Sequence, residues 1–507
     1  MADWVERIGA GERSVASPRA LITLLLGALV PAAAAMQVPM PVLAVLAALL
    51  ALVVLVVRPD IATLAVIAIV YSNAAVVAVR FHNVPFTLAA GSFLLLAVPL
   101  GHYLLVRRAP LIIPPAMPWV LGYLLVQLVS TMLARNSASA AGALAILVSE
   151  GLLLYLLVVN SVRTERVMLG IVFVLLATGA ILGALTLHQE LTQNLSNNYL
   201  GFAQRSGDIT GLFPGQVAIS RPAGPLDGPN RYAQVMVLLL PLAFAVVWGR
   251  YSRRATLLAI GAGILISIAV ALTLSRGAAI GFGLVLVLMF ALRYVRLRNI
   301  AFLGVAIIAL FLVVPQYATR LQTLDAVPGV ANAGVQADGS IRSRLTEMAA
   351  AALVFVDHPI IGVGPDQFPT YYLAYAEKFG LRVRQDDREA HNLYVGIASD
   401  SGVLGSIFFF GAIGVTIRDL ARTRSRLLGS RPQLAYLAAG FMLVLVTFLT
   451  TGIFLHLAME RYFWLIMALG AAVSVIGQHP ANALGEERDA TPGARRRGVQ
   501  SVVQPGG

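Results

Sequence analysis

Long apolar runs separated by short polar stretches recur along most of the chain. An apolar run of about 20 residues, with a range of roughly 17 to 25, crosses a bilayer as a helix. On that rule the pattern predicts about fourteen membrane spans. They are expected at 20–37, 40–57, 61–79, 85–106, 116–134, 140–160, 167–187, 231–249, 256–274, 277–292, 300–315, 392–417, 433–454 and 460–477. The pattern therefore predicts an all-α, polytopic membrane protein.

The composition agrees with that fold class. The 507 residues are 58% hydrophobic and only 12% charged, whereas charged residues make up about 25% of an ordinary soluble domain. A cleaved signal peptide would explain one apolar run near the N-terminus, so their recurrence excludes a secreted soluble protein. The chain has no cysteine, which excludes disulfides, thiol nucleophiles and thiolate metal sites.

The net charge of +13 follows mainly from the placement of arginines between the spans. Short cytoplasmic loops collect Arg and Lys, and this rule predicts that both ends of the chain lie inside. The predicted regions are a cytoplasmic segment at 1–19, a transmembrane domain at 20–477 and a disordered cytoplasmic tail at 478–507. Two long polar loops, 188–230 and 316–391, are then expected on the outer face. Topology accounts for much of the positive charge, and we do not expect nucleic acid as a partner.

The expected inside loops are short and basic, too small for a nucleotide-binding domain. The sequence contains no G-x-x-x-x-G-K-S/T phosphate-binding loop. Any chemistry is therefore expected on the outer face, without ATP or a nucleotide-sugar donor.

His391 is the first candidate for that chemistry. It follows a charged run in the second long loop and stands directly before the span 392–417. An imidazole with a reference pKa near 6.5 can accept a proton from a hydroxyl near neutral pH. The alternative is a histidine that only caps the helix or marks the interface.

Arginines are the second group of candidates. Arg276 interrupts two apolar spans without a carboxylate neighbour in sequence, and an unpaired arginine in a bilayer is costly. Its partner is either a carboxylate from elsewhere in the fold or a phosphate, which a guanidinium binds with two parallel hydrogen bonds. Arg342 and Arg344 begin a helical run in the second long loop. They can add positive charge near Arg276, or they can be a solvated basic pair.

Further polar residues lie at or within the spans. Asn230 and Arg231 follow a Gly-Pro turn and begin a span, and helix N-termini favour anions. Glu150 and Asp400 are intramembrane carboxylates, which are candidates for proton relay or ion coupling. For Asp400 a structural role is equally open, because Gly402 suggests close helix contact.

The order and spacing of several short motifs resemble the superfamily of O-antigen ligases and Wzy-type O-antigen polymerases. The motifs lie within 224–411. They are Gly-Pro-Asn-Arg at 228–231, Leu-Ser-Arg-Gly at 274–277, Arg344 with its helix to His358 and the Gly362–Gly364 turn, and His391-Asn392-Leu393-Tyr394 leading to Asp400, Gly402 and Gly405. The resemblance implies a GT-C-like glycosyltransferase in the bacterial cytoplasmic membrane, with its site facing the periplasm or exterior.

The resemblance also implies roles for matching residues. Arg276 and Arg344 would hold the diphosphate of an undecaprenyl-diphosphate-linked glycan, and His391 would act as, or help position, the base for the acceptor hydroxyl. The reaction would invert the anomeric carbon without a metal or other cofactor. We add Arg342 and Arg231 as further diphosphate ligands. Two residues are assigned supporting roles, Asn230 and Asn392.

Three functions remain open. The leading hypothesis is a polymerase that joins lipid-linked glycan repeat units. The second is a ligase that transfers the finished glycan to a lipid or protein acceptor. The third is an ion-coupled transporter or lipid flippase using Glu150 and Asp400, although the sequence lacks the paired repeats expected of many transporters. Under each hypothesis, membrane lipids are expected to contact the protein.

Overall fold

The structure is a computed structural model that describes residues 58–209, 219–291, 339–379, 388–455 and 457–478. The chain divides into two compact units, Met1–Ile61 and Ala62–Gly507. The helix packing and the site described below belong to the second unit. The predicted spans 20–37, 40–57 and 300–315 and nearly all of the predicted tail lie outside the described residues.

The prediction of a polytopic membrane protein is confirmed. In the described part of the chain, eight helices are long and apolar enough to cross a membrane, or nine if the bent pair α4 (Pro59–Tyr71) and α5 (Ala74–His82) forms one span. The described residues do not establish the predicted total of fourteen spans. Two predicted spans, 116–134 and 277–292, fall on shorter apolar helices, α8 (Met117–Met132) and α15 (Arg276–Ala291).

Most of the other described helices overlap the predicted spans, and three of them lie in the two predicted long loops. In chain order they are α6 (Phe86–Ala90), η1 (Gly91–Leu96), α7 (Ala97–Gly101), η2 (His102–Val106), α9 (Ser137–Ile146), η3 (Leu147–Leu153), α10 (Leu154–Ser161), α11 (Glu165–Leu191), η4 (Tyr199–Gly201), α12 (Pro229–Val237), α13 (Leu240–Gly249), α14 (Arg253–Leu272), α18 (Gly339–Asp357), α19 (Phe368–Phe379), α20 (Leu393–Leu427), α21 (Pro432–Thr451) and α22 (Arg461–Gln478). Several of these helices begin with residues that favour a helix N-terminus. The Thr164 and Ser252 side chains accept backbone N–H bonds at two of them, and Pro229 and Pro432 occupy first turns.

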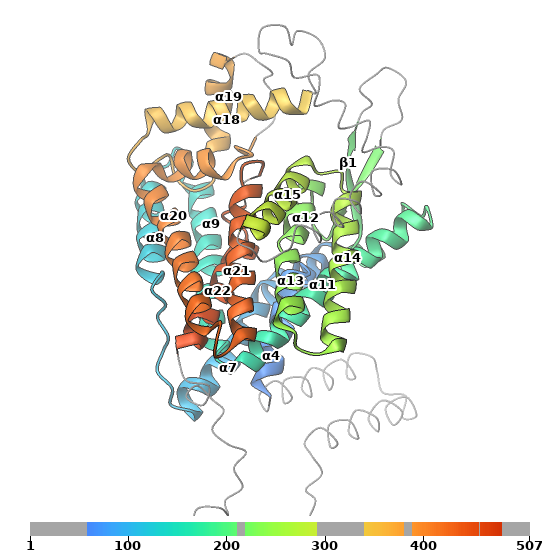
Figure 1. Cartoon of the computed structure of the whole chain (residues 1–507). Coiled ribbons are helices and arrows are strands. Elements are labelled where there is room, and N and C mark those ends of the chain that lie inside the picture. Colours follow the sequence, from blue (N-terminus) through green and yellow to red (C-terminus); the bar gives the residue numbers. More distant parts are fainter. Residues whose placement is uncertain (1–57, 210–218, 292–338, 380–387, 456, 479–507) are drawn as a thin grey trace, which may run out of the picture. The chain divides into compact units, whose positions relative to one another are not determined.

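Helices α20, α21 and α22 of the second unit pack against one another (Figure 1). All residues of α22 from Tyr462 to Gly477 are buried. The ring of Phe463 lies 4.7 Å from that of Phe448 on α21 and 5.1 Å from that of Phe409 on α20, measured between centroids. These aromatic contacts fix the three helices that carry one side of the candidate site.

Small residues permit close approach between neighbouring helices. Apolar surface alone gives no preference for helix contact inside lipid, so membrane helices associate through tight packing of small residues. A Cβ atom at Gly183 of α11 would lie 2.6 Å from the carbonyl oxygen of Leu265 on α14. A Cβ atom at Gly440 of α21 would lie 2.7 Å from Cβ of Ala245 on α13. Larger residues at these glycines would force the helices apart.

The prediction of an all-α fold needs one correction. The first long loop contains two antiparallel strands, β1 (Gln204–Ile209) and β2 (Ile219–Gly224). The sequence did not predict them because both segments contain glycine or proline, which are depleted in strands, and lack an apolar alternation. The rest of the described chain is mainly helical.

A non-helical segment around Gly362 interlocks with a kink in α20. At Gly402 the backbone has φ 63° and ψ −165°, a conformation that is essentially restricted to glycine. The kink allows Val363 N to donate to Ser399 O, and Gly364 N to Asp400 O, each at 2.9 Å. A Cβ atom at Gly402 would lie 2.3 Å from the carbonyl carbon of Ile360. Gly402 thus makes a close contact, but its partner is a turn segment rather than the helix that the sequence suggested.

We predict that Gly402→Ala destabilises the protein by more than about 2 kcal/mol, because it adds backbone strain and a steric clash. Gly414→Ala is the matched control. Gly414 lies in the same helix with open space around it, so that alanine should be neutral or stabilise by up to about 1 kcal/mol. Thermal unfolding in detergent measures both changes. Equal stability of the two variants would contradict the interlock.

Candidate active site

The structure brings His391 against a buried carboxylate. Glu347, on α18, is fully buried, and its Oε2 atom lies 3.0 Å from His391 Nδ1. Its Oε1 atom accepts hydrogen bonds from Arg388 Nε at 2.8 Å and from Ser343 Oγ at 3.0 Å. One buried carboxylate therefore ties α18 to the segment that carries His391.

This arrangement sets the proton positions on the imidazole. His391 Nδ1 faces the Glu347 carboxylate and also lies 2.9 Å from the carbonyl oxygen of Glu389. Both neighbours are acceptors, so Nδ1 carries the hydrogen, and Nε2 of the neutral ring keeps its lone pair. Burial raises the pKa of Glu347, but its contacts with His391 and Arg388 outweigh the burial and leave the pKa below its ordinary value. The carboxylate is therefore charged at neutral pH.

Arg344 lies one turn before Glu347 on α18. Residues three apart on a helix are surface neighbours, so α18 presents this arginine close to the carboxylate that holds His391. The structure describes the backbone of Arg342 in the first turn of the same helix but not its side chain. Arg344 and His391 are thus brought to the same region.

Arg276 begins α15 after a strained turn. Leu274 has φ 53°, which is rare for a bulky residue and costs about 1–3 kcal/mol. The turn is stabilised by Arg221 of β2, whose Nε donates to Thr273 O at 2.7 Å. Ser275 is buried and stands directly before the helix. The turn therefore presents the Arg276 guanidinium from a fixed backbone position.

The turn after α21 connects Arg276 with His391. A Cβ atom at Gly277, next to Arg276, would lie 2.8 Å from Cβ of Phe454. Asn392, next to His391, donates from Nδ2 to the carbonyl oxygen of Ile453 at 2.9 Å. Ile453 and Phe454, neighbours in this turn, thus contact the residues directly next to His391 and Arg276. Asn392 also begins α20, because its Oδ1 accepts hydrogen bonds from the backbone of that helix's first turn.

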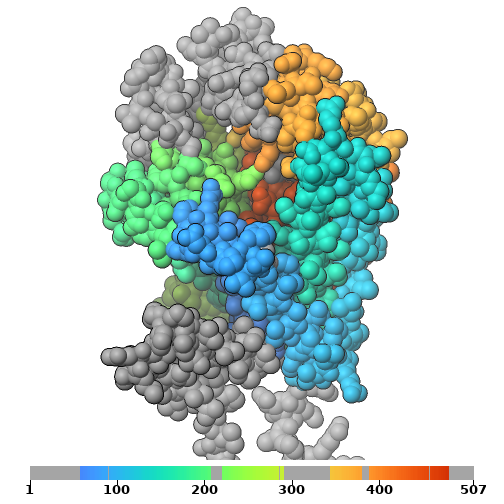
Figure 2. All heavy atoms as spheres, turned by 180° about the vertical axis from the view of Figure 1, so that it is seen from behind, coloured from blue at the N-terminus to red at the C-terminus, as the bar shows by residue number. Residues whose placement is uncertain are grey.

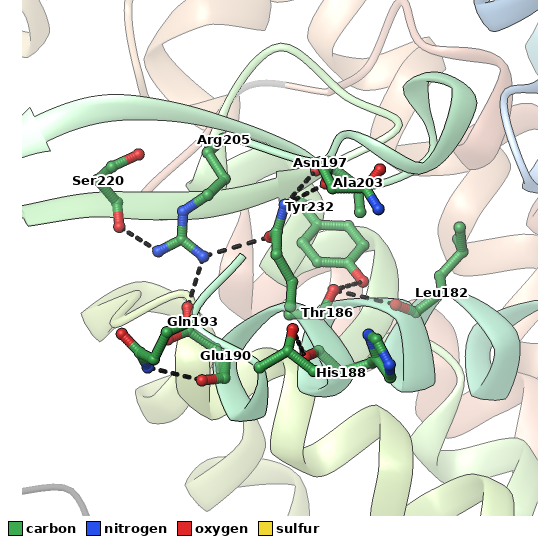
Figure 3. Close-up of polar contacts among 12 residues, drawn as sticks. Leu182, Thr186, His188, Glu190, Gln193, Asn197, Ala203, Arg205, Ser220 and Tyr232 are labelled. Atoms are coloured by element: carbon green, nitrogen blue, oxygen red, sulfur yellow. Dashed lines mark hydrogen bonds and ion pairs between the residues drawn. The ribbon is translucent and has the colours of Figure 1, made fainter. Parts of the chain in front are cut away.

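The hairpin that carries Arg221 is anchored to the end of α11 (Figure 3). Arg205 of β1 donates from Nη1 to Glu190 at 2.5 Å and to Gln189 Oε1 at 3.3 Å, and its Nη2 donates to Ser220 O. The Tyr232 hydroxyl lies 3.0 Å from Thr186 Oγ1 in the same region. These contacts hold β2, and hence Arg221, against the turn before α15.

Asn230 and Arg231 have polar partners of their own. Asn230 Oδ1 accepts a hydrogen bond from Arg221 Nη2 at 3.1 Å. Arg231 forms ion pairs with Glu389 at 2.5 Å and Glu460 at 3.5 Å. The predicted role of Arg231 in binding diphosphate therefore stays a prediction, and its immediate neighbours are carboxylates.

A cavity of about 360 Å³ lies next to this network. It is lined by Ser139, Gly142, Ala143, Ile146, Arg231, Asp366, Phe368, Pro369, Glu389, Ala390, Gly396, Asp400, Met459 and Glu460. In the space-filling view, red C-terminal residues lie at the bottom of a hollow bordered by blue and teal segments (Figure 2). The cavity reaches Glu389 and Ala390, the two residues directly before His391 in the chain.

The intramembrane carboxylates have different surroundings. Glu150 lies 3.5 Å from Arg461. Asp400 is buried, and it lines the cavity at the interlock with the Gly362 segment. In the described ranges no group of three or more His, Asp or Glu side chains is arranged to hold a metal ion.

Two residues that position the site, Glu347 and Arg221, were not predicted from the sequence. Glu347 was part of the helical run after Arg344, but a single glutamate on a helix is usually exposed. A possible signal was its place one turn after Arg344, on the apolar side of the run. Arg221 lies in a loop whose strands were not predicted, so nothing in the sequence linked it to Thr273.

The described site belongs to a helical, polytopic membrane protein that combines arginines with a histidine–carboxylate pair. Residues 261–410 match the family model described as O-antigen ligase. The chain is therefore a membrane protein with an O-antigen ligase domain, and this confirms the family resemblance. The matched range contains Arg276, Arg344 and His391 and begins after Asn230. No curated protein matches the chain.

We predict that Glu347→Gln lowers the free energy of unfolding by about 1–3 kcal/mol at neutral pH, because Arg388 and His391 lose a buried charged partner. The folded-state pKa of Glu347 lies below its ordinary value. The stabilisation is therefore complete above the ordinary value and is lost as the pH falls through the lower, folded-state value. Melting temperatures of the native and variant proteins, compared from pH 7 to pH 3.5, should converge on acidification. A constant difference would contradict the ionised pair.

Proposed function

We propose that the protein transfers a glycan from an undecaprenyl-diphosphate-linked donor to an acceptor hydroxyl, on the outer face of the bacterial cytoplasmic membrane. The single observation that supports this most directly is His391, held by a buried glutamate through Nδ1 and placed near Arg344. The family match supports a lipid-linked glycan as substrate.

In this proposal His391 is the base. The acceptor hydroxyl gives its proton to Nε2 as its oxygen bonds to the anomeric carbon. The bond from that carbon to the diphosphate oxygen breaks with its electron pair, so the carbon inverts. Glu347 stabilises the imidazolium that forms, because its carboxylate already faces Nδ1. This third group orients the base in the way that the acid of a catalytic triad does.

Arg276 and Arg344 are proposed to hold the diphosphate, with Arg342 beside them. The leaving diphosphate gains negative charge in the transition state, and fixed cations stabilise that charge without reorganising. The strained turn at Leu274 and the bond from Arg221 support such a fixed position for Arg276. Asn392 supports the site by fixing the start of α20.

Two acceptors fit this chemistry. We propose a polymerase, in which the acceptor is another lipid-linked repeat unit. A ligase, in which a different lipid or a protein receives the finished glycan, is favoured by the match to the O-antigen ligase family. The product distinguishes them, because only a polymerase yields a ladder of longer lipid-linked chains.

We predict that His391→Ala reduces transfer by about 10²–10⁴-fold, the usual contribution of general acid–base catalysis. The measurement is transfer of a labelled lipid-diphosphate glycan by purified protein in lipid vesicles. His358→Ala is the matched control, since His358 stacks edge-on against Tyr371 rather than on Glu347. If the His391 variant is as active as the His358 variant, the imidazole of His391 is not the base.

We predict that Arg276→Ala and Arg344→Ala each lower transfer at least about 100-fold, because the leaving diphosphate loses a fixed cation. Arg135→Ala serves as the control, because Arg135 lies over the Tyr371 ring at 4.2 Å. Transfer should continue without nucleotide and in the presence of chelator, since arginines supply the positive charge. A strict requirement for a divalent metal would contradict that assignment.

A further inference from the structure

The cavity that reaches Ala390 is lined by more carboxyl groups than cations. Its lining includes four carboxylates, Asp366, Glu389, Asp400 and Glu460, and one cation, Arg231. Arg231 is already paired with Glu389 and Glu460. The lining therefore holds four carboxyl groups and one guanidinium, and the ion pairs of Arg231 are with the two glutamates.

Asp400 points to a ligand rather than to a purely structural contact. Its side chain is 6% exposed, and its carboxyl group accepts backbone hydrogen bonds from Asp366 and Phe368. Its Oδ1 atom is buried and has no hydrogen-bond partner in the part of the chain that the structure describes. Leaving a buried acceptor unsatisfied costs free energy, and a ligand that donates a hydrogen bond would remove that cost.

The wall that carries these carboxylates is held in place by the interlock. Gly364 N donates to Asp400 O at 2.9 Å, which joins the Gly362 segment to α20. Gln367, between Asp366 and Phe368, accepts a hydrogen bond from Asn136 N at 2.9 Å. The carboxylates thus come from rigidly connected parts of the fold, as a selective binding site requires.

We propose that this cavity is the subsite for a sugar ring that carries no negative charge, and that the ring is the one bearing the acceptor hydroxyl. Carboxyl oxygens accept hydrogen bonds, and sugar hydroxyls and amines donate them. The volume lies in the range of small-molecule pockets, roughly 300–1,000 Å³. The ring would place a hydroxyl next to Ala390 and hence beside His391.

The same lining disfavours anionic ligands. A uronic acid or a phosphate would bring a negative charge to a cavity with four carboxyl groups and one guanidinium, and like charges in a partly desolvated site repel. The diphosphate of the donor therefore belongs with Arg276 and Arg344. This proposal rests on the proposed function, because it names the class of acceptor for the same site.

Photoaffinity labelling tests the subsite without turnover. Three diazirine-bearing methyl glycosides of equal size are used, one neutral, one with an amine and one with a carboxylate, on the full chain in lipid vesicles. Peptides are then mapped by mass spectrometry. The neutral and amine probes should label residues around Phe368 and Ala390 at least about tenfold more than the carboxylate probe.

The variant Asp366→Asn should raise labelling by the carboxylate probe about threefold or more, because one repelling charge is removed. Asp357→Asn is the matched control, since Asp357 is exposed and accepts a hydrogen bond from the Tyr375 hydroxyl at 2.7 Å. That variant should leave the labelling ratio unchanged.

Equal or stronger labelling by the carboxylate probe, or absence of labelling at the cavity, overturns the subsite. The transfer assay is read separately. If the native protein transfers glycan but shows no selective labelling, the proposed glycosyltransferase activity stands and the proposed subsite is wrong. If it shows selective labelling but no transfer, the sugar-binding cavity stands and the proposed reaction is wrong.

Discussion

The buried carboxylate of Glu347 is the constraint on which the described site depends. A fully buried charge is stable only with close partners, and the chain supplies three, Ser343, Arg388 and His391. Those partners come from α18 itself and from the segment before α20. Satisfying one charge therefore joins the second long loop to the membrane helices and fixes the orientation of the imidazole.

In the proposed reaction, two charge environments meet around His391. Arg344, on α18 near Glu347, and Arg276, at the start of α15, would form the cationic side. Asp400, at the kink of α20, and Asp366, in the Gly362 segment, line the cavity that would hold the acceptor. A transfer reaction between a lipid diphosphate and a sugar hydroxyl needs both kinds of surroundings, because the leaving group is anionic and the acceptor is not. The separation of charge thus matches the two substrates of the proposed reaction.

The sequence predicted much of the helical fold, because apolar runs of membrane length are a strong signal. It also identified His391, Arg276 and Arg344 as candidates from their motifs. It did not identify Glu347, since burial of that side chain depends on the packing of α18 against α20. The β1–β2 pair was missed because its segments have weak strand propensity, and Arg221 with it. For Arg231, the sequence identified a helix start but gave no sign of Glu389 and Glu460 as partners.

The most direct test of the account is an experimental structure of the full chain with undecaprenyl diphosphate bound in lipid. The account predicts that the diphosphate lies between Arg276 and Arg344, with His391 Nδ1 still on Glu347 and Nε2 facing the substrate. A diphosphate bound in the cavity at Arg231, or an imidazole turned so that Nε2 faces Glu347, would contradict it.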